Sequence, residues 1–206
     1  TLRGSKSTLT RQFDRTIGYA MIKILGNCEI SGIIINGGSD NISVDIQNDE
    51  YKHYADLWVA GDNVDINNCI FDKSCGSSIV YKSCNNINIH NNIFNSFLDH
   101  SIYGRNTDLI TNGINIYSNI FNEDSNSRCV IKNATNINNV NIFSNNFNTP
   151  NSCVFVCESG CKNHNYYANN GNCMDFLECT SKDIKIEDIN IFNNNFTIVS
   201  RIAKLY

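Results

Sequence analysis

Proline and long apolar runs are scarce in this sequence, and their scarcity excludes several kinds of protein. Pro150 is the only proline, so the chain contains no proline-rich linker. No segment reaches the roughly 18 apolar residues of a membrane-spanning helix, and we find no signal peptide. The net charge is -4, and Lys and Arg form no cluster that would bind phosphates. We therefore expect neither a membrane span nor a nucleic-acid partner.

Asparagine is abundant, with 37 residues, and much of it lies in a ten-residue unit that recurs along the chain. Clear copies are NINIHNNIFN at 86–95, GINIYSNIFN at 113–122, NVNIFSNNFN at 139–148 and DINIFNNNFT at 188–197. Seven aligned copies start at residues 27, 63, 86, 113, 139, 163 and 188, which places successive starts 36, 23, 27, 26, 24 and 25 residues apart. A spacing in this range is typical of solenoid proteins.

Apolar residues alternate with polar ones inside each unit, as Ile87 and Ile89 do. This period of two predicts a strand with one buried face. A second strand is expected before each unit, starting near residues 56, 78, 101, 129, 153 and 175, and a short third strand ends at Phe71, Phe94, Phe121, Phe147 and Phe196. Three short strands per repeat predict a parallel β-helix of about seven to eight coils, stacked about 4.8 Å apart.

The chain resembles the right-handed parallel β-helices of the pectate-lyase-like superfamily over nearly its whole length. The resemblance rests on the repeated units and on TLRGSKSTLT followed by MIKILGNCEISGIIING, which is similar to the superfamily's opening coils. It implies an all-β, right-handed solenoid that forms one domain over residues 1–206. The superfamily includes polysaccharide lyases, glycoside hydrolases and viral tailspikes, so the fold alone does not determine function. Neither end shows a clear cap, and we expect the chain to be part of a longer one.

Stacking of the coils turns each aligned position into a column. Asn92, Asn119, Asn145, Asn169 and Asn194 share a column at the turn after the main strand. We expect left-handed backbone angles and a ladder of hydrogen-bonded amides there. The five phenylalanines form a second, interior column. His164, Tyr166 and Gly171 break the pattern, so we expect an irregularity in the coil that starts at Asn163.

Two outward columns contain candidate binding residues. One column is Asp65, Asn88, Asn115, Asn141, Asn165 and Asn190, and the other is Asn67 followed by the rings of His90, Tyr117, Phe143, Tyr167 and Phe192. Exposed rings at one per coil could stack on sugars or pack against a partner. Both interpretations stay open: a glycan-binding strip, or a surface covered by a loop or by another subunit of a homo-oligomer.

The resemblance implies a substrate groove along the first strand of each coil. Aligned by pattern, that strand contributes Leu57, Ile79, Ile102, Val130, Val154 and Phe176 to one column and Trp58, Val80, Tyr103, Ile131, Phe155 and Leu177 to the next. A strand that is apolar on both faces is expected to be buried on both. This favours a subunit contact, as in trimeric viral spikes, over a catalytic wall.

The candidate catalytic residues around this strand are Lys82, Asp99, His100 and Arg105. Lyases of the superfamily remove a sugar proton with a basic side chain while a cation neutralises the uronate, and Lys82 aligns with Arg105 in the next coil. A glycoside hydrolase would instead need two carboxylates about 5 to 9 Å apart, such as Asp99 with Asp72 or Glu123. A solvated loop without chemistry is the alternative in each case.

The 36-residue spacing marks an insertion at residues 39–54, which is expected to form a loop or hairpin beside the first strand. Its acidic residues Asp40, Asp45, Asp49 and Glu50 could hold calcium, although they lack the spacing of an EF-hand loop. No other cofactor is expected.

The ten cysteines lack the spacing of a zinc site. Cys129 aligns with Cys153, and Cys157 aligns with Cys179, so each pair could lie near disulfide distance. Reduced thiols stacked in the core are favoured, which fits assembly in a reducing cytosol.

Two functions remain open from the sequence. The first is a glycan-recognising domain of a spike-type protein on a virion or an extracellular surface, with lyase or hydrolase activity undecided. The second is a non-catalytic structural β-helix whose apolar strand faces are contacts in a homo-oligomer, for which a trimer is the expected form.

Overall fold

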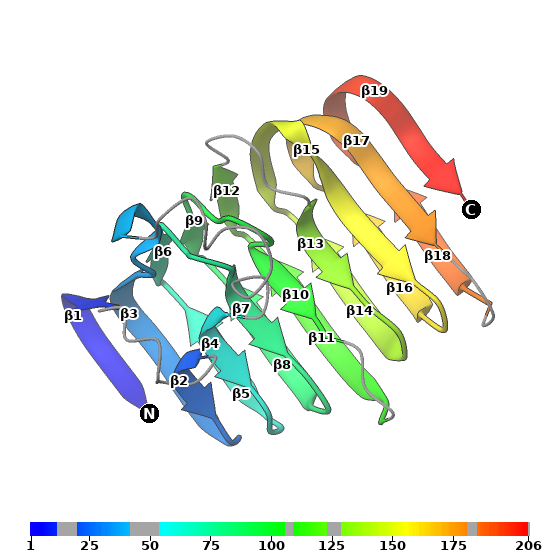
Figure 1. Cartoon of the computed structure of the whole chain (residues 1–206). Coiled ribbons are helices and arrows are strands. Elements are labelled where there is room, and N and C mark those ends of the chain that lie inside the picture. The colour runs from blue at the N-terminus through cyan, green and yellow to red at the C-terminus, as the bar shows by residue number, and fades with distance from the viewer. Residues whose placement is uncertain (12–19, 42–53, 106–108, 123–128, 181–184, 206) are drawn as a thin grey trace.

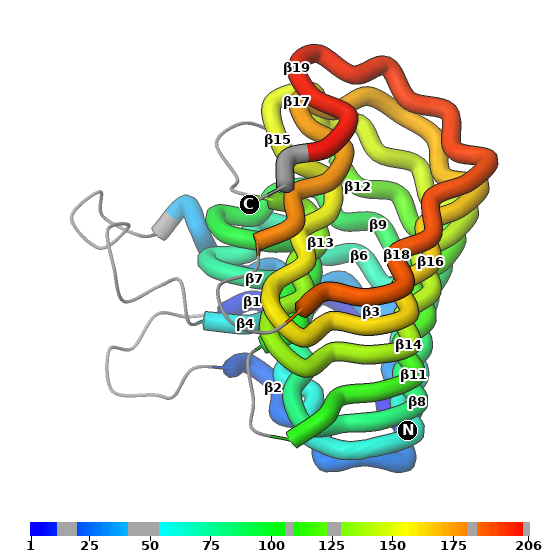
Figure 2. Tube along the Cα trace, turned by 90° about the vertical axis from the view of Figure 1, so that its right-hand side faces the viewer, coloured from blue at the N-terminus to red at the C-terminus, as the bar shows by residue number. Residues whose placement is uncertain are grey.

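The computed structural model describes residues 1–11, 20–41, 54–105, 109–122, 129–180 and 185–205. These residues form a parallel β-solenoid of about 7 turns without an α-helix, so the predicted fold class is confirmed. The coils follow one another as a rod in Figure 1. Figure 2 shows them stacked, with second strands such as β8, β11, β14 and β16 along one side and first strands such as β7 and β13 along the other.

Each coil repeats a first, a second and a third strand, and the paired strands of neighbouring coils are parallel. The first strands are β2 (Ala20–Ile24), β4 (Ala55–Val59), β7 (Ser77–Tyr81), β10 (Ile102–Gly104) and β13 (Cys129–Asn133). The second strands are β5 (Val64–Asn67), β8 (Asn85–His90), β11 (Thr111–Tyr117), β14 (Ile137–Phe143), β16 (Lys162–Tyr167) and β18 (Glu187–Phe192). The third strands are β6 (Ile70–Asp72), β9 (Ile93–Phe94) and β12 (Ile120–Asn122).

Longer strands combine two of these positions. At the N-terminal end, β1 (Leu2–Thr10) and β3 (Cys28–Asn36) join a second and a third strand. Further along, β15 (Asn146–Glu158), β17 (Asn170–Thr180) and β19 (Asn195–Leu205) join a third strand to the first strand of the following coil. A 3-10 turn (Ser39–Asn41) begins the predicted insertion, of which residues 42–53, with Asp45, Asp49 and Glu50, lie outside the described residues.

Left-handed backbone angles mark two corners of each coil. At the first corner φ lies between 47° and 72° at Asn27, Asn63, Asn86, Gly113, Asn139, Asn163 and Asp188, which are the starts of the seven repeats. At the second corner φ is 53° to 55° at Asn68, Asn91, Ser118, Ser144, Ala168 and Asn193. At this second corner the left-handed residue comes directly before the interior asparagine, as Asn91 comes before Asn92. The left-handed angle that we predicted for the asparagine column is therefore wrong by one residue. Asparagine and glycine suit the first corner because they tolerate positive φ, whereas three of the six residues at the second corner are serine or alanine.

The interior asparagines form the predicted ladder of amide hydrogen bonds. The Nδ2 groups of Asn92, Asn119, Asn145 and Asn169 each donate to the Oδ1 of the next asparagine over 3.0 to 3.1 Å. Each of these Oδ1 atoms also accepts the backbone N–H of the asparagine one coil earlier. The side-chain amides therefore provide hydrogen-bond partners for buried backbone N–H groups at a corner where strand pairing does not provide them.

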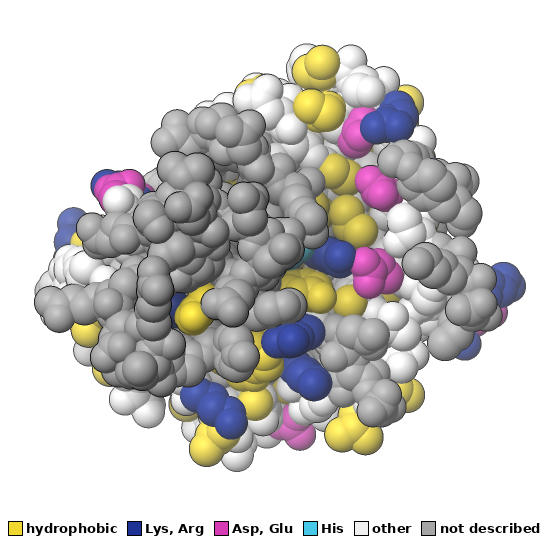
Figure 3. Space-filling model, viewed as in Figure 1, with side chains coloured by type: hydrophobic (Ala, Val, Ile, Leu, Met, Phe, Trp, Pro, Cys, Tyr) yellow, Lys and Arg dark blue, Asp and Glu magenta, His cyan; other side chains and the backbone are white. Residues whose placement is uncertain are grey.

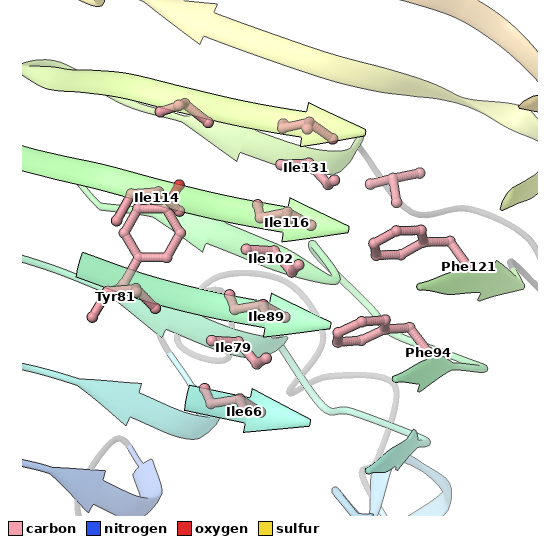
Figure 4. Close-up of a cluster of buried hydrophobic side chains, with 14 of the residues drawn as sticks. Ile66, Ile79, Tyr81, Ile89, Phe94, Ile102, Ile114, Ile116, Phe121 and Ile131 are labelled. Carbon is pink, nitrogen blue, oxygen red and sulfur yellow. The ribbon is translucent and has the colours of Figure 1, made fainter. Parts of the chain in front are cut away.

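Beside the ladder, the phenylalanines and isoleucines fill the core. The rings of Phe71, Phe94, Phe121 and Phe147 stack with centroids 4.7 to 4.9 Å apart. Figure 4 shows Phe94 and Phe121 at one end of two facing isoleucine rows, with Ile79, Ile102 and Ile131 opposite Ile66, Ile89 and Ile116. Of these eight labelled side chains Ile131 is 1% exposed and the others 0%, so burial of apolar surface stabilises the solenoid.

The irregular coil predicted around Asn163 is confirmed at Gly171. Gly171 has a φ of 144°, and a Cβ atom there would lie 1.9 Å from the Phe147 carbonyl oxygen. Without a ring at this position, Phe147 and Phe196 are 5.7 Å apart and tilted by 39°. Phe155 and Phe176 fill the space with edge-to-face contacts.

The strand register corrects one predicted alignment. Ile102 pairs with Ile131 rather than with Val130, so the inner column of the first strands is Leu57, Ile79, Ile102, Ile131, Phe155 and Leu177. The outer column is then Trp58, Val80, Tyr103, Lys132, Val156 and Glu178. A slip of one residue exchanges the two faces of a strand. The predicted outer column is therefore wrong after Tyr103, where Lys132, Val156 and Glu178 take the places of Ile131, Phe155 and Leu177.

Candidate functional site

The five predicted outer rings form a continuous ladder. His90, Tyr117, Phe143, Tyr167 and Phe192 are the last residues of β8, β11, β14, β16 and β18. Successive ring centroids lie 4.7 to 5.0 Å apart, and the planes differ by 2° to 6°. The strand stacking sets this spacing, because the rings occupy the same position in consecutive coils.

Ring stacking covers the faces of the central rings. Tyr117, Phe143 and Tyr167 each have a stacked ring on both sides, so only their edges point outward. Phe192 ends the ladder and is 46% exposed. A sugar that binds by stacking needs a free ring face. The three central rings do not offer one, so this ladder is better suited to edge contacts with a partner.

A ladder of amides runs beside the rings. Asn115, Asn141, Asn165 and Asn190 each donate from Nδ2 to the asparagine one coil earlier over 3.0 Å. At the N-terminal end of this column, the Asp65 carboxylate lies 2.9 Å from His90 Nε2. Apart from this pair, the side chains of both ladders are uncharged.

The outer face of the first strands combines aromatic and cationic side chains. The Arg105 guanidinium lies over the Trp58 ring, 5.2 Å from its centroid, and Lys132 Nζ lies 5.6 Å from the centroid of Tyr103. Both distances are within the range of a cation–π interaction. All four side chains are partly exposed. Figure 3 shows Lys and Arg side chains next to hydrophobic ones on the face that Figure 1 presents. We call Trp58, Tyr103, Arg105, Lys132 and the neighbouring Lys82 the cation–aromatic row.

Lys132 also has an acidic partner in the next coil, because its Nζ lies 2.7 Å from Glu158 Oε1. Burial alone would lower the pKa of Lys132, but the hydrogen bond and charge of Glu158 outweigh it and raise the pKa. Burial raises the pKa of Tyr103 as well. Lys132 therefore stays charged and Tyr103 stays neutral at physiological pH.

The structure separates the four candidate catalytic residues into two pairs. Tyr81 and Gly104 pair at the ends of β7 and β10, and Lys82 and Arg105 follow them, so these two residues occupy the same position in adjacent coils. Both are partly exposed. Asp99 and His100 are 6% and 3% exposed. The Asp99 carboxylate lies 3.5 Å from His100 Nε2, His100 Nδ1 lies 3.0 Å from the Cys129 carbonyl oxygen, and the His100 ring packs against Tyr103.

Some of the other predicted acidic residues lie in the described part of the chain and others do not. Asp72 ends β6, whereas Glu123 lies outside the described residues. Asp40 lies next to Lys73 and forms an ion pair with it. In the described ranges, no group of three or more His, Cys, Asp or Glu side chains is arranged to hold a metal ion.

Sequence reasoning missed a buried polar cluster around Asp56. Asp56 is 1% exposed, accepts a hydrogen bond from Ser74 Oγ over 2.6 Å, and lies 4.0 Å from the Arg11 guanidinium. Burial raises the pKa of Asp56 to about 7, against the smaller opposite effects of Ser74 and Arg11. The pattern "DLWVA" shows only a polar residue at the start of a strand, and its two polar partners, Arg11 and Ser74, lie 45 and 18 residues away in the sequence.

All ten cysteines are described, and all are free thiols, as the sequence favoured. The two predicted alignments are confirmed, because Cys129 pairs with Cys153 and Cys157 with Cys179 across neighbouring strands.

Comparisons with protein-family models, with curated proteins and with solved structures gave no significant match. No helix in the described part of the chain is long and apolar enough to cross a membrane. The structure therefore classifies this chain as a parallel β-solenoid.

Proposed function

We propose that this chain is a glycan-recognising β-helix domain of a spike-type protein, on a virion or an extracellular surface, that binds acidic polysaccharide through the cation–aromatic row. One observation carries the proposal: Arg105 and Lys132 are held over Trp58 and Tyr103 on the outer face of consecutive coils. The spike-type context comes from the resemblance to the superfamily.

The row offers the two kinds of contact that an acidic sugar needs. A guanidinium binds carboxylate or sulfate groups with paired hydrogen bonds, and aromatic and aliphatic side chains cover the C–H surfaces of the sugar ring. Val80 lies between Trp58 and Tyr103 in the same column but is 3% exposed, so the apolar contact comes from the parts of Trp58 and Tyr103 that the two cations leave uncovered. The row crosses β4, β7, β10 and β13 along the axis of the solenoid, as an extended chain would.

Cleavage of the bound glycan is a separate question within this proposal. Lyase chemistry needs a basic side chain at the sugar, and Lys82 and Arg105 are partly exposed. Hydrolysis needs two accessible carboxylates, and Asp99 is 6% exposed. If the domain cleaves the glycan that it binds, lyase chemistry through Lys82 and Arg105 is therefore the activity to test first.

The proposal is tested by titrating the protein calorimetrically with acidic glycans such as oligogalacturonate and alginate, with neutral dextran as the reference. We expect binding to the acidic chains only, and Arg105→Gln should weaken it about tenfold, because a hydrogen bond to a charged group contributes about 1.5 kcal/mol. Lys162→Gln is the control, because Lys162 is paired with Glu187 at the start of β16, away from the row. Equal binding of the two variants, or no binding to any acidic glycan, would overturn the proposal.

The same samples test cleavage. Incubation with each acidic glycan, followed by the absorbance of unsaturated uronates and by a reducing-end assay, separates lyase from hydrolase products. Product that disappears in Lys82→Gln and Arg105→Gln supports the lyase version, whereas binding without product supports a recognition domain only.

A homo-oligomeric structural role is the second candidate, and the outer ring ladder favours it. The central rings present only edges, flanked by neutral amides, which suits packing against another subunit. A trimer is the form to look for. Tyr117→Asp together with Phe143→Asp should then reduce the mass in solution to that of a monomer, whereas Thr197→Asp on the third-strand side should not. A mass that the double variant leaves unchanged rules out this contact.

A further inference from the structure

A cluster of three thiols, a phenol and an imidazole lies inside the solenoid where β15, β16 and β17 meet. Cys157, Cys161, His164 and Tyr166 are each 0% exposed, and Cys179 is 9% exposed. Neither the glycan proposal nor the oligomer proposal uses these groups. Their positions follow from the irregular coil, in which His164 and Tyr166 replace the aliphatic residues found at the same positions in other coils.

Hydrogen bonds orient His164 toward Cys157. His164 Nε2 lies 2.8 Å from the Ile137 carbonyl oxygen, and a carbonyl can only accept, so Nε2 carries the proton. In the neutral imidazole Nδ1 is then an acceptor, and it lies 3.3 Å from Cys157 Sγ. Tyr166 Oη lies 2.8 Å from the same sulfur and 3.0 Å from His164 Nδ1. The thiol, the phenol and the imidazole therefore contact one another, and Nδ1 is the proton acceptor that the thiol and the phenol share.

The Cys157 thiol also contacts two other thiols. Cys157 and Cys179 are paired across parallel strands, and the strand spacing of about 4.8 Å falls in the range of Cα separations that disulfides span. Hydrogen bonding with Cys157 lowers the pKa of Cys161 and of Cys179. The same hydrogen bonds, with burial, raise the pKa of Cys157.

We propose that Cys157 and Cys179 are an oxidation site that forms a reversible internal disulfide with a small peroxide as the oxidant. The Cys179 thiolate attacks hydrogen peroxide, so that an S–O bond forms, the O–O bond breaks, and the departing hydroxide takes up a proton as water. Cys157 then loses its proton to His164 Nδ1 and attacks the oxidised sulfur. The S–S bond forms, the S–O bond breaks, and a second water leaves with that proton.

Peroxide reaches Cys179 by local opening of the strand end at which it lies. Cys179 is the most exposed thiol of the cluster and lies one residue before the end of β17, where it pairs with Leu205. Strand ends open locally at low cost, which admits a small oxidant without global unfolding. The resulting bond ties β15 to β17 near the C-terminal ends of both strands.

The second aligned cysteine pair is an internal reference. Cys129 Sγ lies 3.1 Å from the Ile131 carbonyl oxygen, and Cys153 Sγ lies 3.3 Å from that of Phe155, so both thiol protons are held by backbone oxygens. Burial and a hydrogen bond with Cys153 raise the pKa of Cys129 well above its usual range, and no imidazole contacts either sulfur in the described residues. This pair is therefore expected to stay reduced while Cys157 and Cys179 react.

The test treats the folded protein with stoichiometric hydrogen peroxide, then unfolds it and labels the remaining thiols with N-ethylmaleimide. Intact mass should show eight labels in place of ten, since the chain has ten free thiols, and dithiothreitol should restore all ten. Digestion should yield one linked peptide pair that contains Cys157 and Cys179. Ten labels after oxidation, or a bond at any other pair, would overturn the proposal.

Three variants distinguish a role in disulfide formation from a role in core packing. Cys179→Ser should retain all nine of its thiols under the same treatment, whereas Cys153→Ser should still lose two. His164→Gln should slow disulfide formation about tenfold and flatten the dependence of its rate on pH, because no imidazole then takes the proton. A His164→Gln variant with the wild-type rate and pH profile contradicts the role of His164 in positioning and deprotonating Cys157.

Discussion

Arg105 reaches across an entire coil to cover Trp58. Arg105 follows β10 and Trp58 lies in β4, and the coil of β7 lies between them, yet the guanidinium is 5.2 Å from the centre of the ring. Val80 lies between Trp58 and Tyr103 in the same column and is 3% exposed. An arginine held in this way covers apolar surface and presents its remaining N–H groups outward.

The contact between these two residues should be measurable as a coupling energy. In a double-mutant cycle with Trp58→Leu and Arg105→Gln, we expect the two changes to be non-additive by about 0.5 to 1 kcal/mol, which is typical of a cation–π pair at a partly exposed site. The measurement is the free energy of unfolding in urea for the four proteins. Additive effects would show that the guanidinium does not interact with the ring in solution.

Removing one amide from the interior ladder should be costly. Asn145 donates to the Ile116 carbonyl oxygen over 2.9 Å, and its Oδ1 accepts the backbone N–H of Asn119 over 3.0 Å. Asn145→Ala leaves both backbone groups buried without these partners, and we expect the free energy of unfolding to fall by about 3 kcal/mol. Asn141→Ala in the outer ladder, where water can replace the lost bond, should lower it by less than about 1 kcal/mol. Equal losses in urea unfolding would contradict a special role for the interior column.

The ladders could be predicted from the sequence because stacking makes every aligned position a column. Once the repeat starts were aligned, Asn92, Asn119 and Asn145 had to coincide, and so did the phenylalanines. The same reasoning placed the irregularity at Gly171, where the repeat departs from its own pattern.

The cation–aromatic row could not be predicted in full, and the reason is physical. Val130 and Ile131 are both apolar and both buried, at 0% and 1% exposure. Apolar periodicity therefore gives no information on which of them faces inward, and the alignment slipped by one residue. The slip placed Ile131 outward and hid Lys132 from the outer column. Asp56 was missed for a different reason, since Arg11 and Ser74, which contact it, are distant in sequence.

Burial of Asp56 should make stability depend on pH. Its pKa is raised from 3.8 to about 7 in the folded protein, so between these values the folded state holds a proton that the unfolded state has lost. Stability falls with rising pH wherever the folded state binds more protons. The contribution of Asp56 is therefore largest below pH 4, declines as the pH rises to about 7, and is lost above that value.

Substitution of Asp56 isolates this contribution. Asp56→Asn should reduce the decline in the free energy of unfolding between pH 4 and 7, because an amide does not titrate there. Asp188→Asn is the control, because Asp188 is exposed and lies at a left-handed corner where other coils already have asparagine. Urea unfolding at a series of pH values provides the comparison, and an Asp56→Asn protein with the wild-type slope would contradict the assignment.

Gly113, at a corner of its coil, and Gly171, within β17, should differ in their response to substitution. Gly171→Ala places a Cβ 1.9 Å from the Phe147 carbonyl oxygen at a φ of 144°, a conformation that only glycine adopts readily, so we expect a loss of about 3 kcal/mol or more in the free energy of unfolding. Gly113 has a φ of 72° in a column where other coils have asparagine, and a Cβ added there would lie 3.2 Å from Asn86 Oδ1. Gly113→Asn should therefore change stability by less than about 0.5 kcal/mol, because asparagine tolerates this region and can join the amide column. Thermal and urea unfolding of both variants measure the two losses. Equal destabilisation would mean that the positive φ, rather than the close backbone approach at Phe147, requires glycine.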